Sequence, residues 1–285
     1  MILRTLGITG SACGPQSPSS TYLVQVAAGE VAAGIALGTV APTVPVRNWN
    51  LVLDLGNGGL GMLLQHCQVK DVDAIALSHL HPDHCADLSG FYVHLKYHPR
   101  DGCAFSGQMP RVPVYGPRGV QMRIEEMCGI SDGSSMQGPF TFSAFTSGQQ
   151  VAIGPLTLTP TRVRHSVEAY ALQVNGPSSQ VDRLGQPASL VYTGDTDFCQ
   201  DLVEAARHAD VLLAEAAFVE GRDDAIEGLH LTGKRAGSVA SFAQVKSLLL
   251  THIPVWNDPQ EALAEARQTY DGHLELAVHD GCYLI

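Results

Sequence analysis

The sequence has no run of lysines or arginines, and charged residues are few. They make up 16% of the 285 residues, and 17 basic side chains face 28 acidic ones, which gives a formal net charge of −11 at pH 7. A polyanion such as nucleic acid would be repelled by this net charge unless a local basic patch or a bound metal reversed it. The composition therefore argues against nucleic acid as a partner.

Long apolar segments are also missing. No window approaches about 18 consecutive apolar residues, so the sequence predicts no membrane-spanning helix. The first residues, MILRTLGITGSACG, lack the basic region, apolar stretch and cleavage site of a signal peptide. The seven cysteines, an odd number without a CxxC pair, are typical of reduced thiols. These absences together lead us to expect a cytoplasmic protein.

The sequence does contain the patterning of an α/β enzyme. Short runs rich in Val, Ile and Leu, such as LVLDLG and DAIALS, predict strands through the first half. In the second half, the helical segments DLVEAARHA, LTGKRAGSVASFA and DPQEALAEARQTY alternate with the strand-like DVLLAEA and VKSLLLTH. We therefore expect one domain over residues 1–285, a sheet-on-sheet sandwich with helices on its outer faces.

Residues 27–46 differ from this pattern. The stretch AAGEVAAGIALGTVAPTVPV carries a single charge and many alanines, glycines and prolines. We interpret it as an extended hairpin or loop inserted between two core strands, and we assign it no chemistry.

Histidines are concentrated in one short stretch, HLHPDH, which holds His79, His81, Asp83 and His84. It follows the predicted strand DAIALS and precedes a helical segment. A strand end directs its side chains to one edge of a sheet, and the first helical turn can return Asp83 and His84 to the same point. The alternatives are a surface loop and a structural zinc site, but structural zinc usually has cysteine among four thiolate or imidazole ligands. We therefore expect these four side chains to converge.

Three further candidate ligands stand at predicted strand ends: His165 in RVRHS, Asp195 in YTGDTD and His252 in LLTHIP. With HLHPDH they supply five imidazoles and two carboxylates, which is more than one tetrahedral site can use. The set fits two metals that share a carboxylate at a separation of about 3.5 to 4 Å. Imidazole and carboxylate ligands suit Zn²⁺, and Mn²⁺ or Fe²⁺ also accept them.

The motif HxHxDH, followed by a distant His, Asp and His, resembles the signature of the metallo-β-lactamase superfamily, and the resemblance covers nearly the whole chain. It implies an αββα sandwich of two mixed sheets with helices on both outer faces and metals at one edge. It also implies two ligand triads joined by a bridging Asp195: His79, His81 and His165 at one metal, and Asp83, His84 and His252 at the other.

The spacing of the last three ligands resembles the phosphodiesterase branch, which includes the tRNA 3′-processing endonuclease. Two later segments, VLLAEAAF and LHLTGKRAGSVA, resemble the Glu and His-x-Thr elements of that branch. By this resemblance His230 donates a proton to the leaving oxygen and Glu215 orients it. The structural alternative is a hydrogen-bonded core glutamate and a histidine at a helix start.

The segment DLGNGGLG, residues 54–61, follows a predicted strand and opens a probable helix. A lone glycine-rich turn is weak evidence for a phosphate-binding loop. The resemblance instead implies that Asp54 accepts a hydrogen bond from a metal-bound histidine and so fixes its tautomer.

Within the branch, GITGSACGPQSPSSTYLV, LSHLHPDHCADLSGFYV, YTGDTDFCQDLVEAA and LLLTHIPVW resemble the atypical class II 3′,5′-cyclic-nucleotide phosphodiesterases of bacteria. This resemblance implies hydrolysis of cyclic AMP to 5′-AMP by a hydroxide that bridges two metals. Asp83 would orient the nucleophile and His230 would protonate the departing alkoxide. The resemblance and the apolar segment 27–46 also suggest a homodimer.

Three other functions stay open. A tRNA 3′-processing endonuclease needs a tRNA-holding arm and a basic surface, whereas the segment RDGCAFSGQMPR at 100–111 is short. A thioester or lactone hydrolase would use the same hydroxide but would have less need of a His230–Glu215 pair. A metal-binding scaffold or regulatory protein on a retired hydrolase fold would lack a ligand, and none is missing.

Overall fold

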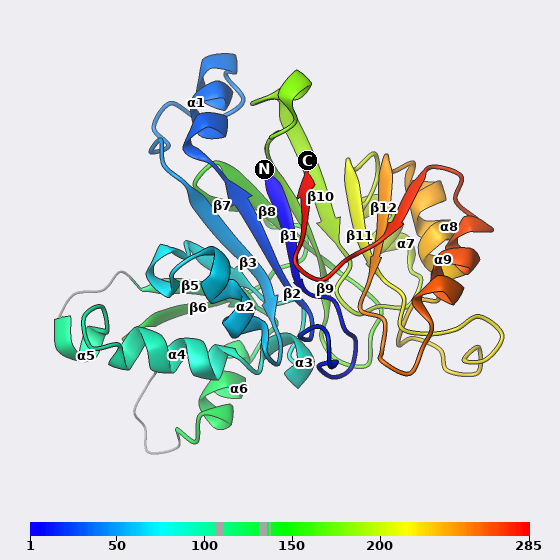
Figure 1. Ribbon diagram of the computed structural model, residues 1–285, viewed down its shortest axis with the longest axis horizontal. Coiled ribbons are helices and arrows are strands. Elements are labelled where there is room, and N and C mark those ends of the chain that lie inside the picture. The colour runs from blue at the N-terminus through cyan, green and yellow to red at the C-terminus, as the bar shows by residue number, and fades with distance from the viewer. Residues whose placement is uncertain (107–110, 131–135, 137) are drawn as a thin grey trace.

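Two mixed sheets packed face to face form the centre of the protein (Figure 1). The structure is a computed structural model that describes residues 1–106, 111–130, 136 and 138–285. In spatial order the first sheet contains β14 (Gly281–Leu284), β1 (Ile2–Gly7), β2 (Thr21–Val26), β3 (Trp49–Leu55), β4 (Ala74–Ala76), β5 (Val112–Gly116) and β6 (Phe140–Ala144). The second contains β13 (His273–Leu276), β12 (Ser247–Thr251), β11 (Val211–Glu215), β10 (Pro187–Tyr192), β9 (Tyr170–Pro177), β8 (Leu156–Arg162) and β7 (Val151–Ile153).

Each sheet joins an antiparallel half to a parallel half. In the first sheet, strands β3 to β6 run parallel, and β14, β1, β2 and β3 pair antiparallel. In the second sheet, strands β10 to β13 run parallel, and β7 to β10 pair antiparallel. Parallel neighbours present their carboxyl ends at the same edge, which is where open α/β sheets bind ligands. The loops after β4, β10, β11 and β12 therefore share one edge of the sandwich.

Helices cover the outer face of each sheet. The longer ones over the first sheet are α2 (Gly59–His66), α4 (Leu88–Tyr97) and α6 (Val120–Met127), and those over the second are α7 (Gln200–Ala205), α8 (Gly233–Ala243) and α9 (Pro259–Arg267). One apolar core lies between the sheets, with Leu53 and Leu172 among its fully buried residues, and one lies under each helical layer. The predicted αββα arrangement is confirmed.

Residues 27–46 do not form the extended hairpin or loop that their composition suggested. Their first part is the helix α1 (Ala28–Leu37), and a loop follows it. Alanine is the best helix former, Glu30 accepts a hydrogen bond from the Ala27 amide at the first turn, and Gly38 ends the helix at φ 75°. The stretch lacks the alternation of polar and apolar residues that marks a surface helix, so its pattern did not reveal one.

Two shorter helices, α3 (Pro82–Cys85) and α5 (Cys103–Ser106), complete the α-helices of the described residues, which also contain two 3-10 helices, η1 (Val69–Asp71) and η2 (Val181–Arg183). The segment 100–111, which we expected to be too short for a tRNA-holding arm, lies partly outside the described residues, which omit 107–110. None of the described helices combines the length and the apolar character needed to cross a membrane.

Candidate metal centre

The motif HLHPDH lies at the shared edge of the sheets, as its position after a strand predicted. His79 and His81 stand on the connection after β4, and α3 begins at Pro82, whose fixed φ suits the first position of a helix. The single turn of α3 then carries Asp83 and His84 back to the same edge. His79 and His84 are fully buried.

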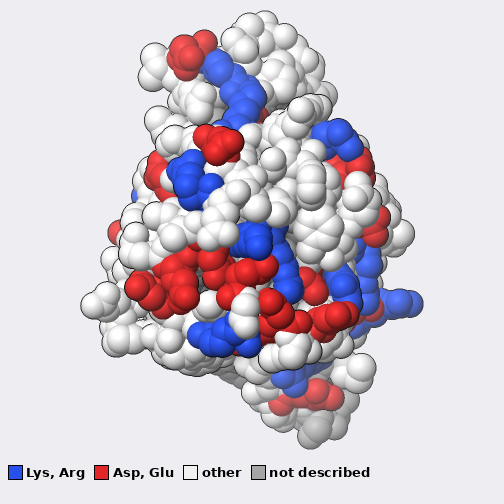
Figure 2. Space-filling view, turned by 90° about the vertical axis from the view of Figure 1, so that its right-hand side faces the viewer, with Lys and Arg blue, Asp and Glu red and all other residues white. Residues whose placement is uncertain are grey.

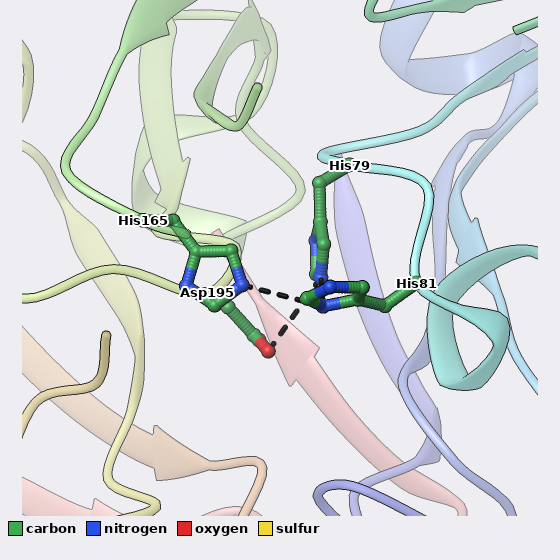
Figure 3. A group of neighbouring side chains, drawn as sticks. All are labelled: His79, His81, His165 and Asp195. Atoms are coloured by element: carbon green, nitrogen blue, oxygen red, sulfur yellow. Dashed lines mark hydrogen bonds and ion pairs between the residues drawn. The ribbon is translucent and has the colours of Figure 1, made fainter. Parts of the chain in front are cut away.

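Three imidazoles and one carboxylate converge in a first group, drawn in Figure 3: His79, His81, His165 and Asp195. The His81 Nδ1 atom lies 3.0 Å from His79 Nε2 and 3.3 Å from His165 Nε2. The Asp195 Oδ2 atom lies 3.7 Å from His79 Nε2. Nitrogen atoms at these separations can share a single ion, because all three point to one place.

A second group shares Asp195 with the first and adds Asp83, His84 and His252. The Nε2 atom of His84 lies 3.2 Å from Asp195 Oδ1, and the Nε2 atom of His252 lies 3.2 Å from Asp195 Oδ2. Asp83 Oδ2 lies 3.4 Å from His84 Nε2. The structure thus brings all seven sequence-predicted ligands together around Asp195. We call these seven side chains the ligand cluster.

Hydrogen bonds on the outer nitrogen of the rings determine which atom faces inward. His165 Nδ1 donates to the Leu229 carbonyl at 2.8 Å, and His84 Nδ1 donates to the Asp54 carboxylate at 2.7 Å. His252 Nδ1 pairs with Ser20 Oγ at 2.7 Å. With Nδ1 engaged, the Nε2 lone pair of each ring is available to a metal.

Three polar atoms of the ligand cluster make no hydrogen bond with the described part of the protein. His84 Nε2, His252 Nε2 and Asp195 Oδ1 are buried and make no hydrogen bond to any described residue. Such atoms are costly to leave unpaired, and a divalent cation bound among them would satisfy them. The set of imidazole and carboxylate donors suits divalent cations.

The side chains of the ligand cluster shift one another's pKa values. Burial by itself raises the pKa of Asp195, but the facing imidazoles of His252 and His84 hold it well below its ordinary value. Burial also keeps the pKa of His79 well below its ordinary value, so that ring is neutral and can act as a ligand. The cluster therefore offers an ionised carboxylate at its centre.

Two residues with an unusual backbone conformation lie at the same edge. Asp54 and His252 have φ values of 54° and 55°, which are unusual for residues with a side chain. Gly194, directly before Asp195, has φ 57°, and a Cβ there would lie 2.7 Å from the Ser78 Cβ. Gly194 therefore permits a close approach that sets the position of Asp195.

A histidine and a glutamate form a pair beside the ligand cluster. His230 Nδ1 lies 2.9 Å from Glu215 Oε1, and the His230 ring lies 5.4 Å from the His165 ring. Glu215 is fully buried and also accepts the main-chain amides of Thr196 and Ala217. Burial by itself favours the neutral imidazole, but the Glu215 carboxylate outweighs it and raises the pKa of His230 to about 9.

The sequence matches a family profile described as a beta-lactamase superfamily domain over residues 52–253. The match spans most of the chain and includes every residue of the ligand cluster. The chain belongs to the metallo-β-lactamase superfamily. It is a metallo-hydrolase of that superfamily, with a His/Asp cluster suited to divalent metals.

Relatives extend over most of the chain. An uncharacterised protein of Mycobacterium leprae is 36% identical over 97% of this chain and 86% of its own length. The probable metallo-hydrolase YhfI of Bacillus subtilis is 26% identical over 81% of this chain and 86% of its own, and a ribonuclease Z of Myxococcus xanthus is 26% identical over 80% and 85%. The YhfI crystal structure superposes with a TM-score of 0.75 over 100% of this chain and 99% of that chain at 22% identity, which supports the fold.

Asp54 lies beneath the ligand cluster and accepts a hydrogen bond from a histidine, as the resemblance implied. It contacts both ligand groups, one directly and one through Ser78. Its Oδ2 atom accepts from His84 Nδ1, from Ser78 Oγ at 2.7 Å and from Tyr192 OH at 2.7 Å. Ser78 Oγ in turn accepts from His79 Nδ1 at 3.1 Å, because its own hydrogen points to Asp54. One buried carboxylate thus orients a ring in each ligand group.

Ser78, Tyr192 and Ser20 were missed by the sequence analysis. Ser78 stands directly before HLHPDH and Tyr192 directly before TGDTD, so their positions beside the motifs were the available signal. Serine and tyrosine are too common at strand ends for that signal to single them out.

Substituting Asp54 with asparagine is expected to weaken metal binding by roughly 10- to 100-fold. An amide presents an N–H group toward donors that now meet a carboxylate, so His84 and Ser78 lose their orientation. Competition with a chromogenic chelator measures the affinity. Asp73→Asn is the matched control, since Asp73 accepts the Asn50 amide and Arg47 but no histidine. Equal affinities for the wild type and Asp54→Asn would contradict this role.

Proposed function

We propose that this metallo-hydrolase is a phosphodiesterase that hydrolyses 3′,5′-cyclic nucleotides, converting cyclic AMP to 5′-AMP. The observation that carries the proposal is the His230–Glu215 pair beside the ligand cluster. A departing alkoxide needs a proton, whereas a departing thiolate does not, so a partly buried and oriented imidazole suits phosphodiester cleavage better than thioester cleavage. The similarity to a ribonuclease Z, a class named for cutting RNA, supports the same chemistry.

We assign the ligands as two triads around a bridging Asp195. His79, His81 and His165 would hold one metal, and Asp83, His84 and His252 would hold the other. Zn²⁺ fits this donor set, and Mn²⁺ or Fe²⁺ are the alternatives. When bound, two such ions supply Lewis-acid activation of water and neutralisation of phosphate charge.

The side chains of the chain divide the remaining work. Burial alone would raise the pKa of Asp83, but His84 outweighs it and lowers that pKa to about 2, so Asp83 is an ionised acceptor that can orient the attacking water. That water would attack as hydroxide after releasing one proton to solvent; its oxygen joins phosphorus, and the bond between phosphorus and the 3′ oxygen breaks. The departing 3′ oxygen takes the proton of His230, whose raised pKa keeps the ring charged at neutral pH.

A tRNA 3′-processing endonuclease is the second candidate, and it is favoured by the relative named ribonuclease Z. The charge of this chain disfavours it. The net charge is −11, and the face over α8 and α9 carries interleaved acidic and basic side chains without a continuous basic area (Figure 2). A tRNA backbone is held mainly by clustered Lys and Arg.

Metal-replete protein is expected to convert cyclic AMP to 5′-AMP and to lose the activity on treatment with a chelator. Re-addition of Zn²⁺, Mn²⁺ or Fe²⁺ to separate samples should restore it and rank the metals, with about two ions per chain at full activity. Chromatography of the products is the measurement, with a 3′-extended tRNA precursor as the parallel substrate. Cleavage of the precursor alone would favour the endonuclease, and turnover of neither would disprove both.

A further inference from the structure

A buried carboxylate outside the ligand cluster lies two residues after Asp195. Asp197 is 4% exposed, and its Oδ1 atom accepts the main-chain amide of Phe198 at 2.7 Å. Arg235, on α8, donates to the same oxygen at 3.1 Å. Burying a charge is costly unless it is fully paired. The hydrogen bonds to this carboxylate therefore fix its position. The proposed reaction itself gives Asp197 no role.

The other oxygen of Asp197 connects two further segments. Oδ2 accepts the main-chain amide of Gly228 at 2.7 Å and lies 3.7 Å from Arg164 Nη1. Gly228 has φ 74°, and a Cβ there would lie 3.2 Å from Arg164 Nε, so glycine allows the loop to come this close. The Asp197 amide also donates to the Arg164 carbonyl at 2.8 Å. Asp197 therefore joins the segments that hold Asp195, His165 and Gly228.

Gly228 belongs to the loop 216–232 between β11 and α8, which carries His230. Residues 224–227 of this loop are exposed. Its return to the ligand cluster is held at two consecutive residues, by Asp197 at the Gly228 amide and by His165 Nδ1 at the Leu229 carbonyl. His230 follows immediately, so these two hydrogen bonds position the segment that carries its ring, together with the Glu215 contact to the ring and the hydrogen bond from the Phe218 amide to the Leu231 carbonyl.

We propose that Asp197 is a positioning residue that holds the His230 loop against the ligand cluster. The inference rests on the proposed role of His230 in phosphodiester hydrolysis. The bond from a main-chain amide to a buried carboxylate is charge-assisted and stronger than a neutral one. The ion pairs that this loop makes near the surface, Arg164 with Glu227 at 3.4 Å and Arg235 with the exposed Asp224 at 3.5 Å, contribute little by comparison.

Hydrogen exchange of the metal-loaded protein tests the positioning without reference to activity. In Asp197→Ala the amides of residues 228–230 are expected to exchange roughly 10-fold faster or more, because the loop loses a hydrogen bond to a charged group. The exchange rates of Asp197→Asn, which keeps one acceptor oxygen, should lie between those of Asp197→Ala and the wild type.

The control is Asp210→Ala. Asp210 is another buried carboxylate with arginine and main-chain donors, but it stands before β11, at the opposite end of that strand from Glu215. Unchanged exchange at 228–230 would overturn the proposal.

Kinetics test whether the held loop acts through His230. Asp197→Ala is expected to lower kcat for cyclic AMP by roughly 10- to 100-fold, a part of the effect of a general acid, with KM and metal content nearly unchanged. Its rate on bis(p-nitrophenyl) phosphate, whose leaving group needs no proton, should stay within roughly 3-fold of the wild type. The double variant Asp197→Ala with His230→Ala should be no slower than His230→Ala alone.

Equal losses of rate on both substrates would show that Asp197 does not act through His230. If the wild type cleaves neither substrate, the proposed function fails, and the exchange result still decides whether Asp197 holds the loop.

Discussion

Asp195→Asn is expected to leave a folded protein with fewer than about one metal per chain and a hydrolytic rate reduced roughly 1,000-fold or more, about 4 kcal/mol of transition-state stabilisation. Asp195 belongs to both ligand groups, with its two oxygens 3.2 Å from the inward nitrogens of His84 and His252. An amide of the same shape presents only one acceptor and no charge. In the proposed assignment both metals would therefore lose a ligand in a single substitution.

Metal analysis and the rate on a phosphodiester, measured on the same preparation, check this expectation. The fold should persist, because Asp195 lies at the sheet edge and outside the three apolar cores. Circular dichroism verifies that point. Asp210→Asn provides the control for loss of a buried carboxylate and should keep both its metals and its rate. Two ions per chain with a normal rate in Asp195→Asn would exclude a bridging role.

His230→Ala is expected to reduce kcat for cyclic AMP by roughly 100- to 10,000-fold while metal content stays intact. The ring is paired with Glu215 at 2.9 Å, and together with Asp195 the two form a third group of possible ligands. In our assignment His230 belongs to neither ligand triad, so its loss removes a proton donor and leaves both triads complete. The rate on bis(p-nitrophenyl) phosphate should change little, because that leaving group departs as an anion. The ratio of the two rates is the informative measurement.

A histidine outside the site controls for loss of an imidazole as such. His273 is exposed and stands beside Ser247, at the start of β12, whereas His252 follows the end of that strand. His273→Ala should therefore match the wild type on both substrates. If His230→Ala slowed both substrates equally, or neither, the proton-donor assignment would be wrong, and a carbonyl substrate would become the better candidate.

The αββα fold and the convergence of HLHPDH could be predicted from the sequence because both depend on local patterns. In HLHPDH the ligands lie within six residues, and a strand end followed by one helical turn is enough to bring them together. His165, Asp195 and His252 were found by their positions at strand ends. Their meeting point depends on the order β12–β11–β10–β9 in the second sheet, which the sequence does not state and the structure shows.

The sequence did not predict the helix α1, because polar and apolar residues do not alternate along it as they do on a surface helix. Its many alanines and the glycine at its end were the available signals. The residues that form hydrogen bonds to the ligand cluster were harder to predict from the sequence. Asp54 meets Tyr192 across 138 residues, and Ser20 meets His252 across 232, so no local pattern connects them. Asp197 likewise reaches Gly228 only because two loops fold onto one sheet edge.

Periodicity along the chain was enough to predict the fold class, and the residues at predicted strand ends were enough to propose a set of ligands. Which nitrogen of each ring faces inward, and which carboxylate lies beneath the ligand cluster, could be seen only in the folded structure. The physical reason is that backbone pattern acts over a few residues, whereas a hydrogen bond between distant segments exists only after the sheets have packed and excluded water from both partners.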